Sequence, residues 1–426
     1  MVLNKLNIKL FSFILSFVFS IYLFEFYILN ISDQYFVCVE LIKNFNFLSF
    51  DNIALPIHCD EGPYRNASVN LETFFSRENP YQGRPLYVFL IFLLRSIGES
   101  IFPNGFSDYL IFRISLVVLQ AIILFFISKL MTVLLNFKLD KFIDYFYLIL
   151  LLMIPNIRWN IFFPSHGSLT LLFLLLTLCV MNKKIKFLKN RKNLYLVLGL
   201  LSLAHSSAVM YALIIFLYDF LNEKKINLSS LILLPLAQII YEFSYRLAGF
   251  QSYDWGREVY KQFYWIFDVL QGDETGECQQ LNTFLKCYFQ ITQNYLGYFI
   301  LGLTFLFIIF AYRKFNFVGK NKLLNQLFLC CLITYIFWSF MGYYESFRFV
   351  NYSIGYFIFL SFIFYMKEID HYKYLFGISI LFYQISIKYL EPFELTIVDF
   401  NFFNVSSSVL FLGYLYTNIL KDRKKT

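Results

Sequence analysis

Long apolar runs, separated by short polar segments that are often basic, dominate this sequence. A helix crosses the hydrocarbon core of a bilayer with roughly 20 apolar residues, and about 12 segments come near that length. The run 193–221 is too long for one ordinary span, and its flanks are both basic, so we divide it at His205-Ser206-Ser207. The expected spans are residues 10–30, 108–136, 142–155, 165–181, 193–206, 207–221, 228–248, 294–312, 323–342, 350–366, 373–388 and 405–420. The pattern predicts an all-α integral membrane protein with about 12 transmembrane helices.

Basic residues gather in alternate connections between these runs. Lys and Arg mark cytoplasmic segments of membrane proteins, and this rule predicts a cytoplasmic N-terminus and C-terminus. Most of the 36 Lys and Arg then fall in the cytoplasmic segments 1–9, 137–144, 182–193, 219–227, 313–322, 367–373 and 421–426. We expect a multi-pass protein of a bacterial inner (plasma) membrane.

The outer side has two long polar stretches, residues 31–107 and 249–293. Residues 84–98 are too short for a span and would reverse the orientation of the following basic segments. We therefore expect an interfacial helix on the outer leaflet, with Arg84 and Arg95 at its polar margins. Without repeats or linkers, the chain is expected to form one polytopic membrane domain over residues 1–426.

Composition supports this class of protein. Of all residues, 59% are hydrophobic and 15% are charged, whereas a soluble domain has about 25% charged residues. The net charge of +8 is spread over short clusters, so we expect membrane lipids and no nucleic acid as partners. The seven cysteines show no paired CxxC spacing, which disfavours a zinc site.

The first outer loop contains more carboxylates than a connection requires. Asp33 follows the first span by about three residues, and residues 34–47 have the apolar spacing of a short surface helix. Such a carboxylate can accept a proton from an attacking hydroxyl. Asp60 and Glu61, followed by Gly-Pro, are expected in a turn where they reach a hydroxyl or a divalent metal. Solvated surface charges are the simpler alternative for each carboxylate.

Arginine on the outer side is suited to phosphate, because its planar fork binds phosphate oxygens in two places. Arg84 opens the interfacial helix and Arg348 lies where a short turn enters a span; the alternative for Arg348 is an ion pair with Glu345. Arg65 is a further candidate in the first loop. His166, at the mouth of the span 165–181, is a candidate metal ligand, proton donor or phosphate partner.

The order of these features resembles the GT-C class of glycosyltransferases that use polyprenyl-phosphate sugars, including dolichyl-phosphate-mannose and aminoarabinose transferases. In that class an acidic residue follows the first helix, a Pro-containing stretch begins a surface helix that ends near Gly, and a long helix with an early Arg comes next. Here Ser32–Phe36, Gly83–Tyr87 running to Gly98, and Phe112–Ser115 occupy that order. The resemblance covers roughly residues 10–136.

The resemblance implies transfer of a sugar from a lipid phosphate to a glycan, lipid or protein acceptor on the outer face. Asp33 takes the base position by its distance from the first helix, and Asp60-Glu61 takes it by the dipeptide itself. Arg348 resembles the late outer arginine that binds carrier phosphate. No cofactor is certain, and a divalent metal is a candidate. One alternative is an O-antigen-type polymerase or ligase, because such enzymes have a large functional loop late in the chain, as residues 249–293 are here. The other is a transporter or flippase of lipid-linked sugars.

Overall fold

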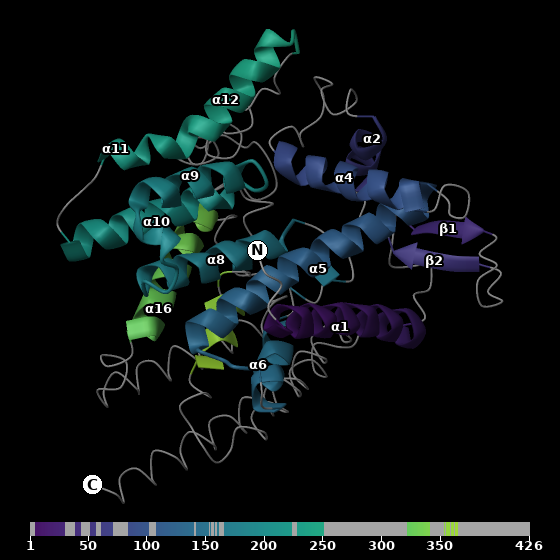
Figure 1. Cartoon of the computed structure of the whole chain (residues 1–426), viewed down its shortest axis with the longest axis horizontal. Helices are drawn as coiled ribbons and strands as arrows, with labels where there is room; N and C mark the ends of the chain where they lie inside the picture. Colours follow the sequence, from purple (N-terminus) through teal and green to yellow (C-terminus); the bar gives the residue numbers. More distant parts are fainter. Residues whose placement is uncertain are drawn as a thin grey trace, which may run out of the picture. The chain divides into compact units, whose positions relative to one another are not determined.

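Helices make up nearly all of the described chain in this computed structural model (Figure 1). The described residues are 5–29, 39–43, 52–56, 61–70, 84–101, 108–139, 142–152, 154, 157, 160–161, 166–223, 228–250, 322–340, 353, 355–357, 359–361 and 363–364. The chain divides into two compact units, Met1–Lys141 with Asn156–Asp254, and Phe142–Pro155 with Trp255–Thr426. The expected single membrane domain stays a prediction.

The first unit contains the elements that build the candidate site. Its elements are α1 (Lys5–Leu29), β1 (Val39–Lys43), β2 (Asn52–Pro56), α2 (Glu61–Val69), α4 (Pro85–Ile101), α5 (Asp108–Leu135), α8 (Ser168–Met181), the 3-10 helix η2 (Phe187–Lys189), α9 (Arg191–Ser202), α10 (Ser207–Glu223), α11 (Leu228–Leu231) and α12 (Leu233–Leu247). The second unit contains α6 (Phe142–Leu152) and α16 (Lys322–Phe340), with further helical residues between 353 and 364.

α1 packs antiparallel to α5. Lys129 donates a hydrogen bond of 2.7 Å to Asn7 Oδ1, and the rings of Phe11 and Phe125 have centroids 5.8 Å apart. Residue numbers rise along α1 as they fall along α5. The N-terminal end of α1 therefore lies beside the C-terminal half of α5.

α5 and α8 run parallel. Gln120 of α5 donates to the hydroxyl of Ser168 at the start of α8, and Lys184, just after α8, donates to Asn136, just after α5, over 3.0 Å. Both contacts keep nearly the same difference in residue number, so the helices share one direction.

α9 and α10 form an antiparallel pair with a turn at residues 203–206. Asn190 caps α9 by accepting a hydrogen bond from the backbone N–H of Lys192 (3.0 Å), which satisfies one of the unpaired donors at a helix start. Arg191 at the start of α9 binds Asp219 near the end of α10 through two contacts, of 2.6 and 2.7 Å. The break of the run 193–221 into two helices at His205 is confirmed, whereas their assignment as two membrane spans is not supported.

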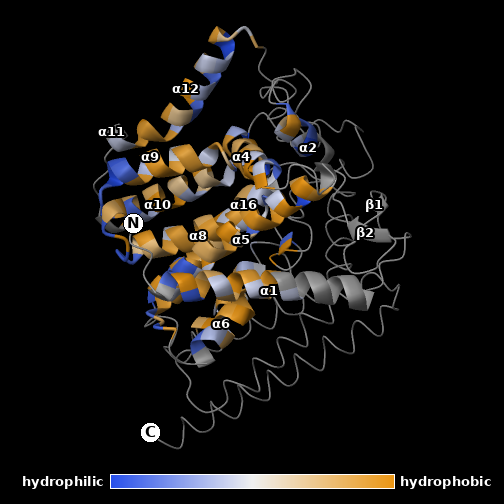
Figure 2. Ribbon diagram, turned by 45° about the vertical axis from the view of Figure 1, so that its right-hand side comes forward, coloured by the Kyte–Doolittle hydropathy of each residue, from blue (hydrophilic) through white to orange (hydrophobic). Residues whose placement is uncertain are grey.

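Exposed apolar side chains form lines along the helices of the first unit. On α4, Phe89, Leu93, Ile97 and Ile101 are all exposed and lie four residues apart, so they share one helix face. Arg95 of the same helix is only 4% exposed. Figure 2 shows that orange, hydrophobic residues extend along the helices of this unit. On this helix the arginine is buried and a line of large apolar side chains is exposed.

One helix among the described residues is long and apolar enough to cross a membrane by length and composition, Leu110–Leu135 with 26 residues. The expected number of about 12 spans is therefore not supported. α8 has 14 residues and α10 has 17; at 1.5 Å per residue they are about 21 and 26 Å long, less than the roughly 30 Å of a hydrocarbon core. A single such helix is weak evidence, because the buried core helix of a soluble protein passes the same test.

Two local predictions are wrong. Residues 34–47 were expected to form a surface helix, but Val39–Lys43 form strand β1, which pairs antiparallel with β2, Val39 opposite Pro56 and Lys43 opposite Asn52. The Asp60-Glu61-Gly-Pro stretch was expected in a turn, but α2 begins at Glu61. Proline suits the first turn of a helix, where its missing N–H has no intrahelical partner to lose.

Candidate functional site

Arg84, immediately before α4, is the centre of a polar cluster in the first unit. Its Nη1 donates a hydrogen bond of 2.8 Å to the hydroxyl of Tyr64 in α2. The same nitrogen lies 3.5 Å from Nδ1 of His166, in the turn before α8. Three segments far apart in the sequence therefore converge on one guanidinium group.

Tyr87 supports this cluster from one turn into α4. Its ring contacts the rings of Tyr64 and His166 edge-on, with centroids 5.5 and 6.0 Å away. Tyr64 and Tyr87 are both buried, whereas Arg84 and His166 are half-buried. Aromatic side chains thus form the wall of the site, and the charged group and one imidazole remain partly open to solvent.

The turn between α9 and α10 is joined to the same place. The backbone N–H of Leu86, two residues after Arg84, donates to the carbonyl of Leu203 (3.1 Å). His205 in this turn has its ring centroid 5.0 Å from that of His166. The chain thereby brings a second imidazole to the cluster from a fourth segment.

His205 is 1% exposed and is oriented by the start of α10. The backbone N–H of Ser207 donates to Nδ1 of His205 over 3.2 Å, and the Ser207 hydroxyl lies 2.7 Å from the same nitrogen. Nδ1 is thus an acceptor, and a neutral ring carries its proton on Nε2. The guanidinium beside Nδ1 of His166 can only donate, so a neutral His166 ring that accepts from it carries its proton on Nε2.

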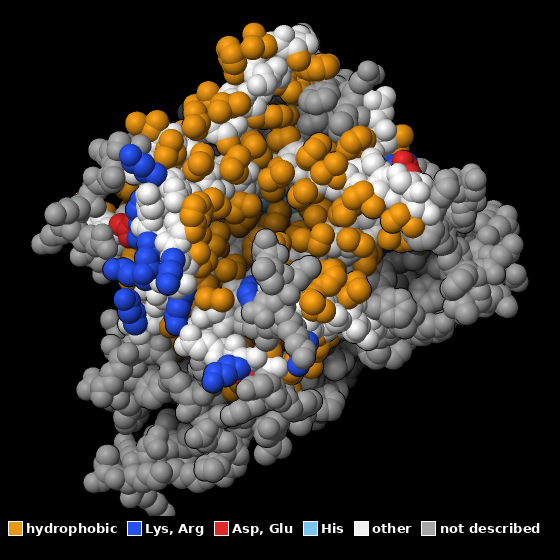
Figure 3. Space-filling model, in the orientation of Figure 1, with side chains coloured by type: hydrophobic (Ala, Val, Ile, Leu, Met, Phe, Trp, Pro, Cys, Tyr) orange, Lys and Arg blue, Asp and Glu red, His pale blue; other side chains and the backbone are white. Residues whose placement is uncertain are grey.

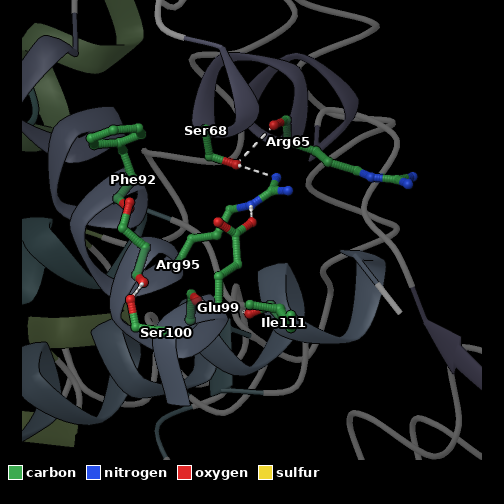
Figure 4. Close-up of polar contacts among 9 residues, drawn as sticks. Arg65, Ser68, Phe92, Arg95, Glu99, Ser100 and Ile111 are labelled. Carbon is green, nitrogen blue, oxygen red and sulfur yellow. Dashed lines mark hydrogen bonds and ion pairs between the residues drawn. The ribbon is translucent and has the colours of Figure 1, made fainter. Parts of the chain in front are cut away.

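Arg95 fixes α2 on α4 at a second point (Figure 4). Its Nη1 donates to the hydroxyl of Ser68 in α2 (3.3 Å), and its Nε binds Glu99 (2.8 Å). Ser68 in turn donates to the carbonyl of Arg65 (2.8 Å). Together with the Tyr64 contact, this link defines how α2 lies across the start of α4.

The structure brings together only part of the set of residues expected from the sequence. Arg84 and His166 are in contact, as candidates for one site. Arg65 lies on α2, but its guanidinium points away from Arg95 and Ser68 (Figure 4). Glu61 is the first residue of α2, one helical turn before Tyr64. Asp33, Asp60 and Arg348 lie outside the described residues.

Three members of the cluster were not expected from the sequence. Tyr64 and Tyr87 are two of 33 tyrosines, and no local pattern distinguishes them. His205 was expected at the turn between two spans and not among the site residues. The local sequence could have indicated a role for His205, because a histidine followed by Ser-Ser before a helix offers a side-chain acceptor where capping residues are usual.

The cluster is suited to binding an anion. An arginine fork, a tyrosine hydroxyl and an imidazole Nε2–H are all hydrogen-bond donors, and charge-assisted bonds from arginine to phosphate are among the strong ones. Among the described residues, His, Cys, Asp and Glu form no group of three or more that could hold a metal ion. The described part of the site thus offers cationic and neutral donors rather than carboxylate ligands.

Comparisons with protein-family models, with curated proteins and with solved structures give no match to this chain.

Proposed function

We propose that the chain is a membrane glycosyltransferase that moves a sugar from a polyprenyl-phosphate donor to an acceptor on the non-cytoplasmic face. The observation that carries the proposal is the convergence of Tyr64, Arg84 and His166 on one point at the start of α4 and α8. A lipid-linked sugar presents a phosphate that must be held while its bond to the sugar breaks. A pre-positioned guanidinium with neighbouring donors stabilises that departing charge.

The surface of the first unit supports placement in a membrane. Besides the line on α4, large apolar side chains are exposed on α9, α10 and α12, among them Leu200, Leu217, Ile239 and Phe243. Figure 3 shows hydrophobic, orange side chains over much of the face in view, with many of the Lys and Arg side chains gathered at its left side. Exposed apolar area of this extent in water would promote aggregation, so a lipid environment agrees with it better.

The polarity of the helices supports an outer location of the site. Basic residues follow α5 and α8 and precede α9, whereas His166 precedes α8 and His205 follows α9. At 1.5 Å per residue, α8 separates His166 from the Lys-rich turn by about 21 Å. If the basic end is cytoplasmic, the Arg84 cluster faces the other side.

The acceptor hydroxyl needs a base, and there are two carboxylate candidates for it. Tyr64 ties α2 to Arg84, and Glu61 lies one turn earlier in the same helix. Asp60 directly precedes it. The Asp60-Glu61 pair is therefore one candidate for the base, and Asp33 is the other. In this mechanism the carboxylate takes the proton of the acceptor, the acceptor oxygen attacks the anomeric carbon, and the carrier leaves as a phosphate held by Arg84.

The test is sugar transfer by the full-length protein in membranes supplied with a radiolabelled polyprenyl-phosphate sugar. Replacing Arg84 with Gln removes the phosphate donors and is expected to lower kcat by about 10²–10³-fold. Arg84→Lys keeps the positive charge but lacks the planar fork of arginine, so its kcat is expected to lie between those of the wild type and Arg84→Gln. Lys138→Gln removes an equal charge from an exposed position after α5 and is expected to retain full activity.

Several outcomes would overturn this proposal. Activity of Arg84→Gln equal to that of Lys138→Gln would remove Arg84 from the reaction. Movement of the lipid-linked sugar across the bilayer without a new glycosidic bond would instead establish a transporter. Separate Glu61→Gln, Asp60→Asn and Asp33→Asn variants identify the base, and full activity in all three would refute the carboxylate mechanism.

A further inference from the structure

A second polar feature lies at the opposite end of the same helices. The segment from the end of α8 to the first residues of α9, residues 182–192, is here called the basic turn. It contains no acidic residue and six cations, which are Lys183, Lys184, Lys186, Lys189, Arg191 and Lys192. The catalytic proposal uses none of them.

Two of these cations already have a structural role. Arg191 is bound to Asp219, and Lys184 donates to Asn136. The other four, Lys183, Lys186, Lys189 and Lys192, have exposed side chains. Figure 3 shows Lys and Arg side chains gathered at one border of the apolar surface.

Lys183 of the basic turn occupies a backbone position at which glycine is the usual residue. The N–H of Lys184 binds the carbonyl of Cys179, and the N–H of Lys183 binds that of Val180. This pair of bonds is the Schellman arrangement that ends a helix, and its left-handed position is usually glycine. Lys183 occupies it with a φ of 55°, so a charge is kept at a position that is conformationally unfavourable for it.

Apolar groups continue directly from the cations. Phe187, in the middle of the basic turn, is 62% exposed. Leu196 and Leu200 on α9 are also exposed and, four residues apart, lie on one helix face. Cations beside a continuous apolar face match the junction between phosphate headgroups and acyl chains in a bilayer.

We propose that the basic turn binds the headgroups of anionic lipids, through Lys183, Lys186, Lys189 and Lys192. A nucleic acid would match the charge but not the exposed Phe187 and the apolar face of α9, so the lipid is the partner that fits both. The proposal rests on the membrane location in the proposed function and not on sugar transfer. Each lysine near an anionic surface is worth about 1 kcal/mol, or about a fivefold change in affinity.

The test is the number of lipids that the purified full-length protein retains from bilayer discs, counted by native mass spectrometry. Discs of phosphatidylcholine with phosphatidylglycerol are expected to give selective retention of phosphatidylglycerol. Replacing the four lysines by Gln is expected to abolish this selectivity. Replacing the same four by Arg keeps the charge and is expected to preserve it.

Lys183→Gly separates lipid binding from stability, because glycine relieves the left-handed backbone while one charge is lost. The thermal unfolding midpoint is expected to rise, and the affinity for phosphatidylglycerol is expected to fall about fivefold. If the four-Gln variant retains phosphatidylglycerol like the wild type, or if an RNA oligonucleotide displaces the lipid, the proposal is refuted. If the protein transfers sugar in pure phosphatidylcholine but does not retain phosphatidylglycerol selectively, the lipid site is refuted and the proposed transferase activity is not.

Discussion

Gly199 of α9 lies against the backbone of α12, and a single added methyl group tests that packing. A Cβ at residue 199 would lie 2.5 Å from the carbonyl oxygen of Leu234 and 3.2 Å from that of Leu233. Both atoms belong to the backbone of α12, so no side-chain rotation can relieve the contact. The two helices would have to separate by nearly 1 Å to restore an ordinary distance.

The cost of that separation exceeds the gain from a better helix former. Overpacking a well-packed contact costs about 1–3 kcal/mol, and Gly to Ala in a helix returns about 0.5–1 kcal/mol. We therefore expect Gly199→Ala to lower the free energy of unfolding by about 1–2 kcal/mol. The separation should weaken the packing of Leu194, Leu198 and Leu234, which belong to one buried hydrophobic cluster.

Gly98→Ala is the matched control. It is the same substitution in another helix, α4, and the added Cβ would lie 3.1 Å from the Ile111 Cγ2 atom. A side-chain methyl can move by a few tenths of an ångström, so the change in stability is expected to be near zero or slightly favourable, about 0–0.5 kcal/mol.

Thermal unfolding of the purified protein can be followed with a thiol-reactive dye, since the free thiol of Cys179 is fully buried. For a unit of this size, about 1 kcal/mol corresponds to a shift of about 2–4 °C in the unfolding midpoint. Gly199→Ala should therefore unfold several degrees below Gly98→Ala. Equal midpoints for the two variants would show that α9 and α12 are not in backbone contact at this position.

Three further substitutions test single interactions, each by the same unfolding measurement. Asn190→Ala removes the cap of α9 and is expected to lower the free energy of unfolding by about 1 kcal/mol. Asn190→Asp keeps a side-chain acceptor and is expected to leave it nearly unchanged, so equal losses in the two variants would refute the capping role. Asp219→Asn leaves Arg191 with a weaker partner and is expected to cost about 1 kcal/mol, less at high salt because the pair is partly exposed; a loss that is independent of salt would argue against an ion pair. His205→Leu removes the acceptor at the start of α10 and is expected to cost about 1 kcal/mol, whereas His205→Asn supplies another acceptor and should cost less. A larger loss in His205→Asn would contradict that role.

Helix positions in the first unit were predictable from hydrophobic runs, because each run is a local property of the sequence. α5 and α10 begin where the runs 108–136 and 207–221 predict, and the break at His205 follows from the basic flanks. The strand β1 was missed for the opposite reason. Its five residues are stabilised by pairing with β2, and the partner of a strand does not follow from spacing within it.

The candidate site was only partly predictable, because it depends on how helices cross. Arg84 and His166 were chosen for their chemistry at helix ends, and the contact between them needed the packing of α4 against the turn before α8. Tyr64 enters the site because α2 is a helix that Arg95 and Ser68 hold against α4. A turn at residues 60–63, as expected from Gly-Pro, would not have suggested that placement.

The parallel arrangement of α5 and α8 has a consequence for biosynthesis. Antiparallel neighbours pair as soon as the second helix leaves the ribosome, whereas parallel ones wait for the chain between them to return. Until then the side chain of Gln120 lacks the Ser168 hydroxyl to which its Nε2 donates. A nascent chain that ends before residue 168 therefore leaves this polar group of α5 without its partner until α8 is made.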